Sequence, residues 1–398
     1  MTVDRRAPVP QTGRAPQLPA LTGLRFIAAM LVVCLHYTTT ILAPRSELLH
    51  RMASMGEVGV SIFFILSGFI LIYVYPIEGR AIRGSVSRFF AARFARIYPA
   101  YLCAALFSLP LIAWNLAPSF GWPTVLATLG LLQAWVPSMA LEWNGPGWSL
   151  SAEAFFYACF PVLALALGLL SVRKLCMLLA ALWFVLLGVS SLYHILQPDG
   201  PAPVWPPTWL VVVWFNPLSR LPEFAMGIAL GHLYGRVQRG DLQLPWWARP
   251  KILLPTSLTA SVLGLIFGPS LPTVYSGHGV FDPAFAAVIF SLPAASGIVA
   301  RFLASTPMVA LGEGSYSIYL LQAPVWGWVC HLWGLSNAQA IAMPSMVAFQ
   351  IGALILLALL VHRLIEEPAR QAIRARLARA SRVDRPESKV IPVLLKHQ

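Results

Sequence analysis

The stretch from Leu21 to Leu42, LTGLRFIAAMLVVCLHYTTTIL, is long and apolar enough to cross a bilayer as one helix. It also carries Arg25 and, eleven residues later, His36. Eleven residues are about three helical turns, so both side chains share one face, roughly 16 Å apart along the axis. A charge at bilayer depth costs on the order of 2.5–3.5 kcal/mol. We therefore interpret the pair as functional; the alternative is that Arg25 reaches the membrane surface while His36 only packs.

The composition is typical of a helical membrane protein. Of the 398 residues, 58% are hydrophobic and 11% are charged, whereas a soluble domain has about 25% charged residues. Apolar blocks of about 20 residues fit membrane helices rather than the short, alternating strands of a β-barrel. The net charge of +13 does not indicate nucleic-acid binding, because the basic residues cluster in a few connections and at the two ends, as cytoplasmic loops do.

Eleven apolar blocks recur along the sequence. They cover residues 21–42, 58–77, 97–116, 122–138, 149–170, 174–194, 209–235, 252–269, 281–300, 307–333 and 344–365. If all eleven crossed, the later basic connections would lie outside the cell, against the positive-inside rule. The block at 122–138 is the shortest and ends at a proline, so we predict that it is re-entrant or interfacial. The predicted fold class is an all-α, polytopic integral membrane protein with about ten transmembrane helices.

The predicted organisation has three parts in the cell's inner (plasma) membrane, with both termini cytoplasmic. Residues 1–17 form a disordered cytoplasmic N-terminus, residues 18–370 a membrane domain, and residues 371–398 a basic cytoplasmic tail. The five cysteines lie in or beside apolar blocks, and none has metal-ligand spacing. We therefore expect neither a disulfide framework nor a metal site.

A polar stripe follows the chain break at residues 145–147. Ser149, Glu153 and Tyr157 recur every four residues and share one face of a helix that starts near Trp148. The break leaves backbone donors at the helix N-terminus, which suit an anion or an oxyanion. The alternative is that Ser149 is an N-cap and Glu153 an ordinary first-turn acid.

Two other groups of polar residues lie at or inside apolar blocks. Arg88, Arg93 and Arg96 form a basic helix entry on the cytoplasmic side, where guanidinium groups suit phosphates, although plain topology and lipid headgroups are an equal alternative. Ser315, Tyr319 and Gln322 share one helix face, and interhelical hydrogen bonding is the alternative there.

We predict a packing role, a local structural role or no role for three further groups of charged residues. They are the Arg220–Glu223 pair ahead of Gly227 and Gly231, the His278–Asp282 spacing in a loop, and Glu366 in a local charge network at a helix end.

Together these stretches resemble the membrane acyltransferase-3 family of O-acyltransferases, which modify bacterial surface sugars, lipids and some macrolides. The resemblance covers about residues 18 to 370. Its carriers, in order, are Arg25-x10-His36, GEVGVSIFFILSGF (56–69), RFARIYP (93–99), WSLSAE (148–153), RLPEF (220–224) and SYSIYL (315–320). Where many members read Tyr-Leu-x-His, this chain has Gln322, which cannot serve as a base.

The resemblance implies an essential Arg25–His36 pair, a catalytic acid at Glu153, and donor binding by Arg93 and Arg96. We extend the predicted donor- and substrate-binding set within the same motifs. These further residues are Trp148, Ser149, Tyr157, Ser315, Tyr316 and Tyr319.

The expected reaction moves an acyl group, acetyl in the first instance, from acyl-CoA to a hydroxyl. His36 would act as general base, since its reference pKa of about 6.5 suits that role. We expect acyl-CoA as a co-substrate and no permanently bound cofactor. The expected partners are the bilayer and a carbohydrate, glycolipid or glycosylated metabolite, and not nucleic acid. The alternative is a transporter or flippase of a lipid-linked sugar.

Overall fold

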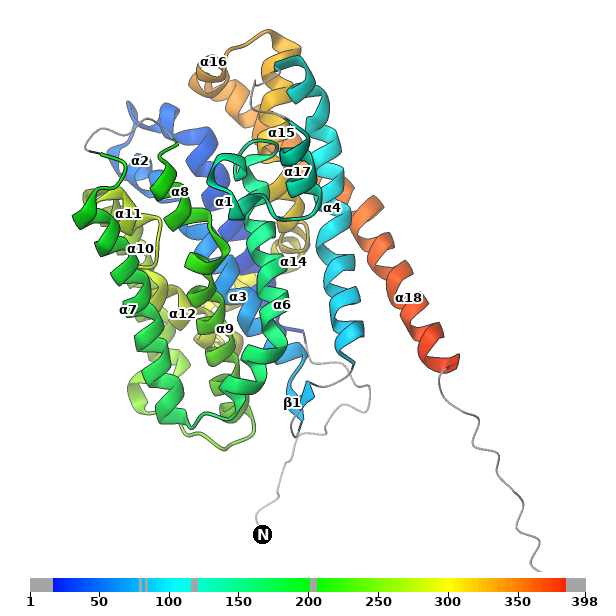
Figure 1. Cartoon of the computed structure of the whole chain (residues 1–398). Helices are drawn as coiled ribbons and strands as arrows, with labels where there is room; N and C mark the ends of the chain where they lie inside the picture. The colour runs from blue at the N-terminus through cyan, green and yellow to red at the C-terminus, as the bar shows by residue number, and fades with distance from the viewer. Residues whose placement is uncertain (1–16, 79–80, 83–84, 116–120, 201–205, 384–398) are drawn as a thin grey trace, which may run out of the picture.

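The structure is a computed structural model that describes residues 17–78, 81–82, 85–115, 121–200 and 206–383. Helices dominate it and run mostly along one direction (Figure 1). The described residues contain one antiparallel pair of two-residue strands, β1 (Ile77–Glu78) and β2 (Ala81–Ile82). The predicted all-α class is confirmed. Residues 1–16 of the predicted N-terminal segment and residues 384–398 of the predicted tail lie outside the described residues.

The first helices of the chain are α1 (Pro19–Leu42), α2 (Glu47–Ser54), α3 (Val58–Val74), α4 (Val86–Asn115), α5 (Trp122–Leu129), α6 (Trp148–Gly168), α7 (Val172–Leu196), α8 (Thr208–Phe215) and α9 (Pro217–Gln238). They are followed by α10 (Pro250–Phe267), α11 (Thr273–Ser276), α12 (Asp282–Ser291), α13 (Ile298–Leu303), α14 (Thr306–Glu313), α15 (Ser315–Trp333), α16 (Asn337–Ala342), α17 (Pro344–Val361) and α18 (Glu367–Val383). A π-helix, η7 (His362–Glu366), joins α17 to α18.

Six helices among the described residues are long and apolar enough to cross a membrane. They are formed by α1, α4, α6, α7, α10 and α17. The pair α2 and α3, bent by 45°, gives a seventh if it counts as one span. The protein is thus a multi-pass membrane protein. Fewer of the described helices meet this length and hydropathy requirement than the predicted count of about ten.

Local breaks divide several of the predicted apolar blocks. The block at 209–235 divides at Asn216, whose side chain accepts a hydrogen bond from Leu218 N and caps α9, and the following Pro217 disfavours helical backbone at Asn216. The block at 307–333 divides at Gly314 between α14 and α15. The block at 281–300 leaves its helix through a 3₁₀ turn, η6 (Leu292–Ala294). Hydropathy alone does not register these local breaks.

The segment at 122–138 contains no helix of spanning length. It folds as α5 followed by two 3₁₀ turns, η1 (Gln133–Trp135) and η2 (Pro137–Met139). Asn144, just beyond it, donates from Nδ2 to the carbonyl of Leu320 at 3.0 Å. That carbonyl needs a partner, because Pro324 four residues later has no N–H to offer. The non-spanning segment is thereby fixed to α15.

Helices α3 and α9 touch at their backbones. A Cβ added to Gly68 would lie 2.2 Å from the carbonyl oxygen of Phe224, and one added to Gly227 would lie 2.0 Å from that of Ile65. Only a residue without Cβ allows so close an approach. The packing role predicted for Gly227 is confirmed.

The same interface buries an ion pair. Arg220 and Glu223 are 2% and 0% exposed, and Arg220 Nε lies 3.1 Å from Glu223 Oε2. Ser61 on α3 bridges them: its Oγ donates to Glu223 Oε1 at 2.8 Å and accepts from Arg220 Nη2 at 3.1 Å. Arg220 Nη1 also donates to the carbonyl of Gly277 at 3.0 Å. Buried charges need such partners, since leaving one unpaired costs several kcal/mol.

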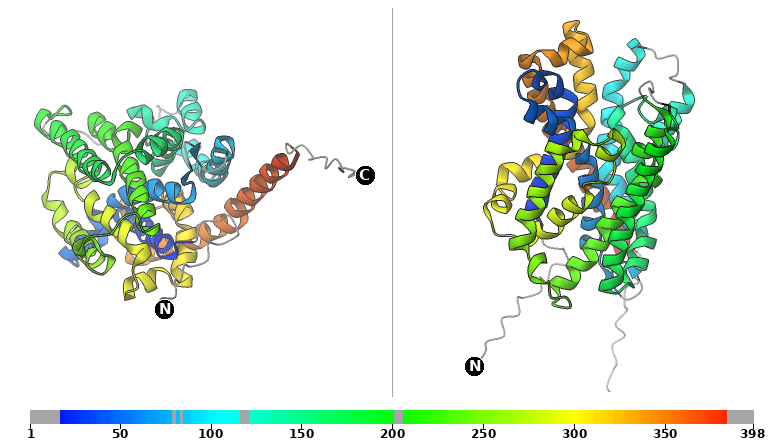
Figure 2. Two further views of the ribbon diagram at one scale, coloured as in Figure 1. Left: turned by 90° about the horizontal axis from the view of Figure 1, so that it is seen from below. Right: turned by 90° about the vertical axis from the view of Figure 1, so that its left-hand side faces the viewer.

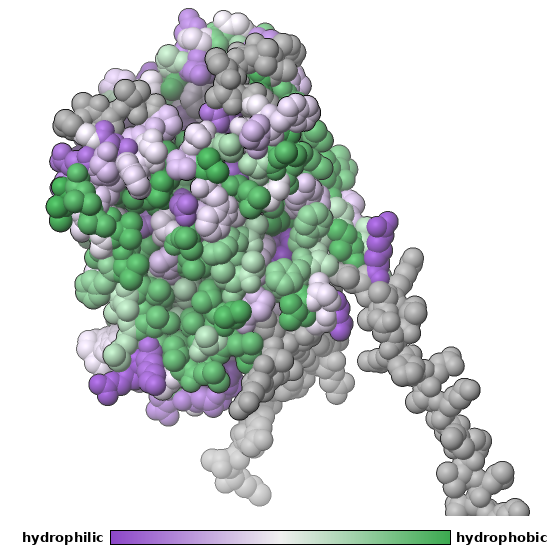
Figure 3. Space-filling model, in the orientation of Figure 1, coloured by the Kyte–Doolittle hydropathy of each residue, from purple (hydrophilic) through white to green (hydrophobic). Residues whose placement is uncertain are grey.

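An apolar surface covers the middle of the face of the bundle that Figure 3 shows. Figure 3 shows a hydrophobic band with hydrophilic side chains gathered toward its ends. The first turn of α1, the start of α4, the start of α7 and the end of α9 lie at one end, and α18 runs away from the bundle there (Figures 1 and 2). We call this the basic end, after Arg88, Arg93, Arg96, Arg173, Lys174, Arg236, Arg239, Arg249 and Lys251.

The glycine contact predicts a sharp difference between two glycine-to-alanine substitutions. Gly227→Ala forces backbones apart and is expected to destabilise the protein by about 1–3 kcal/mol, the usual cost of overpacking. Gly188→Ala on α7 is the matched control, because a Cβ there meets nothing within 4 Å. It should be neutral or slightly stabilising, as alanine favours helix over glycine. Thermal unfolding of the two purified variants in detergent checks this; equal unfolding temperatures would contradict it.

Candidate functional site

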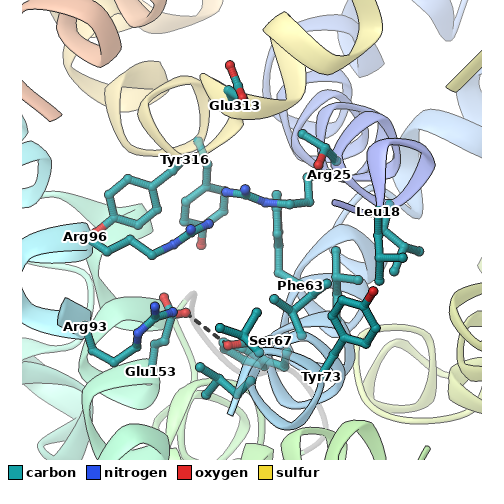
Figure 4. Close-up of a pocket in the computed structure, with 18 of the residues that line it drawn as sticks. Leu18, Arg25, Phe63, Ser67, Tyr73, Arg93, Arg96, Glu153, Glu313 and Tyr316 are labelled. Atoms are coloured by element: carbon teal, nitrogen blue, oxygen red, sulfur yellow. Dashed lines mark hydrogen bonds between the residues drawn. The ribbon is translucent and has the colours of Figure 1, made fainter. Parts of the chain in front are cut away.

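A cavity of about 340 Å³ lies inside the bundle (Figure 4). Its wall begins with Gln17 and Pro19 at the start of α1 and with Val74 at the end of α3, all at the basic end. It ends deeper in the bundle at Val60 and Tyr319. Helices α4, α6, α14, α15 and α18 and the π-helix η7 complete the wall. The cavity therefore extends inward from the basic end.

The cavity is lined by charged side chains. Its four arginines and three glutamates are Arg25, Arg93, Arg96, Arg370, Glu153, Glu313 and Glu366. Figure 4 shows Arg25 entering from α1 and Arg96 entering from α4 on the opposite wall. Because the four arginines outnumber the three carboxylates, the interior suits an anionic ligand.

Glu153 is held from two sides. Its Oε1 accepts hydrogen bonds from Ser67 Oγ at 3.2 Å and from Tyr157 Oη at 2.5 Å. The stripe of Ser149, Glu153 and Tyr157 therefore faces the cavity, since all three line it. Ser149 does not cap α6: its Oγ donates to the carbonyl of Pro146 at 3.0 Å. The capping alternative for Ser149 is wrong.

Arg93 lies beside two aromatic rings, and its Nε has no hydrogen-bond partner among the described residues. Its guanidinium lies 5.4 Å from the ring centre of Tyr75 and 6.0 Å from that of Tyr157, and its Nη2 donates to Tyr75 Oη at 3.4 Å. The Nε atoms of Arg93 and Arg370 are buried without a hydrogen-bond partner among the described residues. Buried donors of this kind are ready to bind an anion.

Sequence reasoning missed His362, and it assigned Glu366 only to a local charge network. Both line the cavity, and His362 Nδ1 lies 3.0 Å from Glu366 Oε2. They sit at the two ends of the π-helix η7. An inserted π turn shifts side-chain direction along a helix and is frequent at functional sites. Nothing in the hydrophobic pattern of 344–365 indicates it.

Tyr316 and Tyr319 line the cavity from α15. Tyr316 Oη donates to the carbonyl of Ile97 at 2.7 Å, which ties α15 to α4. The ring of Tyr319 packs edge-on against Phe63, with ring centres 6.0 Å apart. The rings of Phe63 and Tyr319 lie at the deep end of the cavity.

His36 lies beyond that end and does not line the cavity. Its side chain is exposed, and its Nδ1 lies 2.9 Å from Gln322 Oε1, one turn of α15 past Tyr319. Arg25 and His36 thus occupy different parts of one helix face, and a single turn of α15 separates the cavity from His36.

Trp148 and Ser315 also lie outside the cavity wall. Trp148 packs between Phe64 and Arg220, with the Arg220 guanidinium 6.0 Å from its ring centre. Ser315 Oγ donates to the carbonyl of Gly312 at 2.7 Å within its own turn. The contacts of both residues are those of packing.

Comparison with known proteins identifies the family. Residues 18–363 match the family described as an acyltransferase domain. The chain belongs to the acyltransferase-3 family. It is 27% identical to the acyltransferase MdmB of Streptomyces mycarofaciens over 393 residues, which covers 91% of this chain and 94% of that protein. It is 23% identical to the O-acetyltransferase OatA of Staphylococcus aureus (strain NCTC 8325 / PS 47) over 334 residues, 77% of this chain but 50% of OatA. No solved structure matches the chain closely.

The free arginine donors predict anion binding in the acyltransferase cavity. Inorganic pyrophosphate is expected to raise the unfolding temperature of the detergent-purified protein, by an amount equivalent to about 2.7 kcal/mol at a hundredfold excess over its Kd. Higher salt should weaken the effect.

The effect of pyrophosphate should disappear in Arg93→Gln and persist in Arg239→Gln. Arg239 is a suitable control because it lies at the same end but is 62% exposed, pairs with Asp241 and is not part of the cavity wall. Equal responses in both variants would show that the anion binds elsewhere.

Proposed function

We propose that the protein is an integral-membrane O-acyltransferase that moves an acyl group, acetyl in the first instance, from acyl-CoA to a hydroxyl of a carbohydrate or glycosylated acceptor. The observation that carries the proposal is an arginine-lined cavity, open toward the basic end, in a member of an acyltransferase family. The names of its relatives, an acyltransferase and an O-acetyltransferase, agree with this chemistry.

The cavity fits the phosphate-bearing part of the donor. Arg93 and Arg96 come from α4, and Arg25 and Arg370 approach from α1 and α18. Guanidinium groups bind phosphate oxygens through paired N–H donors, and Arg93 Nε and Arg370 Nε have no other partner among the described residues. With the phosphates held there, the pantetheine arm would reach past Phe63 and Tyr319 toward His36.

The proposed reaction needs one base, which takes a proton from the acceptor hydroxyl and later gives it to the leaving thiolate. His36 Nε2 takes the proton of the acceptor hydroxyl as that oxygen attacks the thioester carbon. The C–O bond forms, the C–S bond breaks, and the imidazolium returns the proton to the leaving thiolate, which gives the ester and free CoA. Base catalysis of this kind contributes about 10²–10⁴-fold to a rate.

In this proposal Glu153 acts in the cavity that binds the donor, and it does not orient His36. Its hydrogen bonds go to Ser67 and Tyr157, inside the cavity. There its carboxylate offsets part of the arginine charge and holds the Tyr157 hydroxyl in place. A direct contact between Glu153 and His36 forms no part of the proposal.

We further propose that α9 and α15 cross the membrane as well, toward the predicted total of about ten spans. They contain 22 and 19 residues. Their mean hydropathy is lowered by polar groups that face the protein interior, such as Arg220, Glu223 and Gln322. With the basic end cytoplasmic, the described ends of the chain lie inside the cell, and the membrane is the inner (plasma) membrane.

Replacing His36 tests the proposed chemistry. His36→Ala is expected to lower the rate of labelled acyl-CoA consumption in membranes by about 10²–10⁴-fold, because the base is lost. Binding of pyrophosphate should remain, since His36 does not line the cavity. His194→Ala is the control, because this exposed histidine on α7 packs against the Tyr275 ring and does not line the cavity. Unchanged consumption in His36→Ala would refute the proposal, and movement of a lipid-linked sugar without acyl-CoA consumption would favour the transporter alternative.

The acceptor can be identified by comparing cells with and without the protein. Mass spectrometry of their surface glycans and secreted metabolites should reveal one species that gains the mass of an acyl group, acetyl in the first instance, when the protein is present. The same species should lack that mass in cells that make His36→Ala. Acylation that persists in those cells would mean that another enzyme is responsible.

A further inference from the structure

The side chain of Gln322 is buried and contacts the histidine that the proposed reaction uses as its base. Gln322 is 1% exposed, and its Oε1 lies 2.9 Å from His36 Nδ1. An amide cannot take up a proton near neutral pH, so its contribution must come through its contact with His36.

The orientation of the Gln322 amide is fixed by a second contact. Its other terminal atom lies 2.9 Å from the backbone carbonyl oxygen of Tyr319. A carbonyl oxygen only accepts hydrogen bonds, so the atom that faces it must be the NH₂ group, Nε2. The atom that faces His36 is then the amide oxygen, which also only accepts. His36 Nδ1 must therefore carry the proton.

From this geometry we infer that Gln322 is a positioning residue that holds His36 as the Nδ1–H tautomer and leaves Nε2 with its lone pair free to act as the base. The second ring nitrogen is the one left for a substrate, since Nδ1 is engaged with Gln322. Nothing in the family comparison assigns this role. The catalytic meaning of the inference rests on the proposed function, while the tautomer itself does not.

Gln322 is in turn held by its surroundings. Tyr37, next to His36 on α1, donates from Oη to the backbone carbonyl of Gln322 at 2.5 Å. Asn144 anchors the same stretch of α15 through the Leu320 carbonyl. These contacts fix both the backbone and the amide of Gln322, so the imidazole meets an acceptor already in place.

An amide differs from a carboxylate in what it does to a histidine. Both accept the Nδ1 proton and fix the tautomer, but a carboxylate also stabilises the imidazolium by its charge. Tyr37 is the adjacent titratable residue on α1, and the His36 ring makes its polar contact with the neutral Gln322. The amide therefore orients the base without favouring its protonated, inactive form.

Nitrogen NMR of histidine-labelled protein tests the tautomer directly, with His36→Ala to identify the His36 signals. In the unaltered protein we expect a protonated Nδ1 and an unprotonated Nε2. In Gln322→Leu we expect a mixture of tautomers. A protonated Nε2 in the unaltered protein, or tautomer populations that do not change in Gln322→Leu, would overturn the inference and leave the proposed function standing.

Acyl-CoA consumption as a function of pH gives the second readout. Gln322→Leu should lose about 10- to 100-fold in rate, whereas Gln350→Leu should not. Gln350 is a fair control because it is also fully buried and donates from its amide to a backbone carbonyl, that of Ala340. Thermal unfolding of both variants shows whether a loss reflects folding; a loss of rate that tracks unfolding equally in both would count against the positioning role.

Gln322→Glu should retain the tautomer but shift the pH of half-maximal rate upward by about one unit, because the added charge favours the imidazolium. A merely structural role would not move the pH profile, so an unchanged half-maximal pH would overturn the inference. If the tautomer is as inferred but neither the unaltered protein nor any variant consumes acyl-CoA, the proposed function fails while the assignment of the proton stands.

Discussion

The close backbone contact between α3 and α9 is the constraint on which the rest of the structure depends. Gly68 and Gly227 each sit against a carbonyl of the other helix, at distances that no other residue permits. Because the two helices are held so near, Ser61 on α3 can bridge Arg220 and Glu223 on α9. An ion pair that would be costly in a membrane interior thereby gains hydrogen bonds from Ser61 to both of its partners.

That buried pair connects packing to the site. Arg220 lies against the rings of Phe64 and Trp148. Phe64 lines the cavity, and Trp148 begins α6, the helix that carries Glu153 and Tyr157 into it. The orientation of the polar stripe on α6 therefore depends on a contact outside the cavity. RLPEF and WSLSAE, which are far apart in the sequence, form one structural unit.

The sequence predicts this site in part, for reasons that differ from residue to residue. Helical periodicity is enough to place Glu153 and Tyr157 on one face. Charge patterning is enough to place Arg93 and Arg96 toward one end of a helix, but the prediction that they start it is wrong, because α4 begins earlier, at Val86. Periodicity fails at His362 and Glu366, because a π turn changes the direction of side chains without changing composition. It also fails to separate Arg25 from His36, since sharing a helix face says nothing about where another helix closes a cavity. Hydropathy also does not register the helix ends at Asn216 and Gly314, which lie inside apolar runs.

The single turn of α15 between Tyr319 and Gln322 has an electrical consequence. One helical turn is about 5.4 Å, whereas the hydrocarbon core of a bilayer is about 30 Å thick. A polar cavity reaches this turn from the basic end, and His36 is exposed just beyond it. Water and mobile ions in such a cavity carry the potential of the adjoining solution inward, so the voltage falls over the remaining protein. In the proposed reaction, a proton taken up at His36 would therefore move through a steeper field than across an unbroken bilayer, in which one charge crossing 100 mV corresponds to about 2.3 kcal/mol.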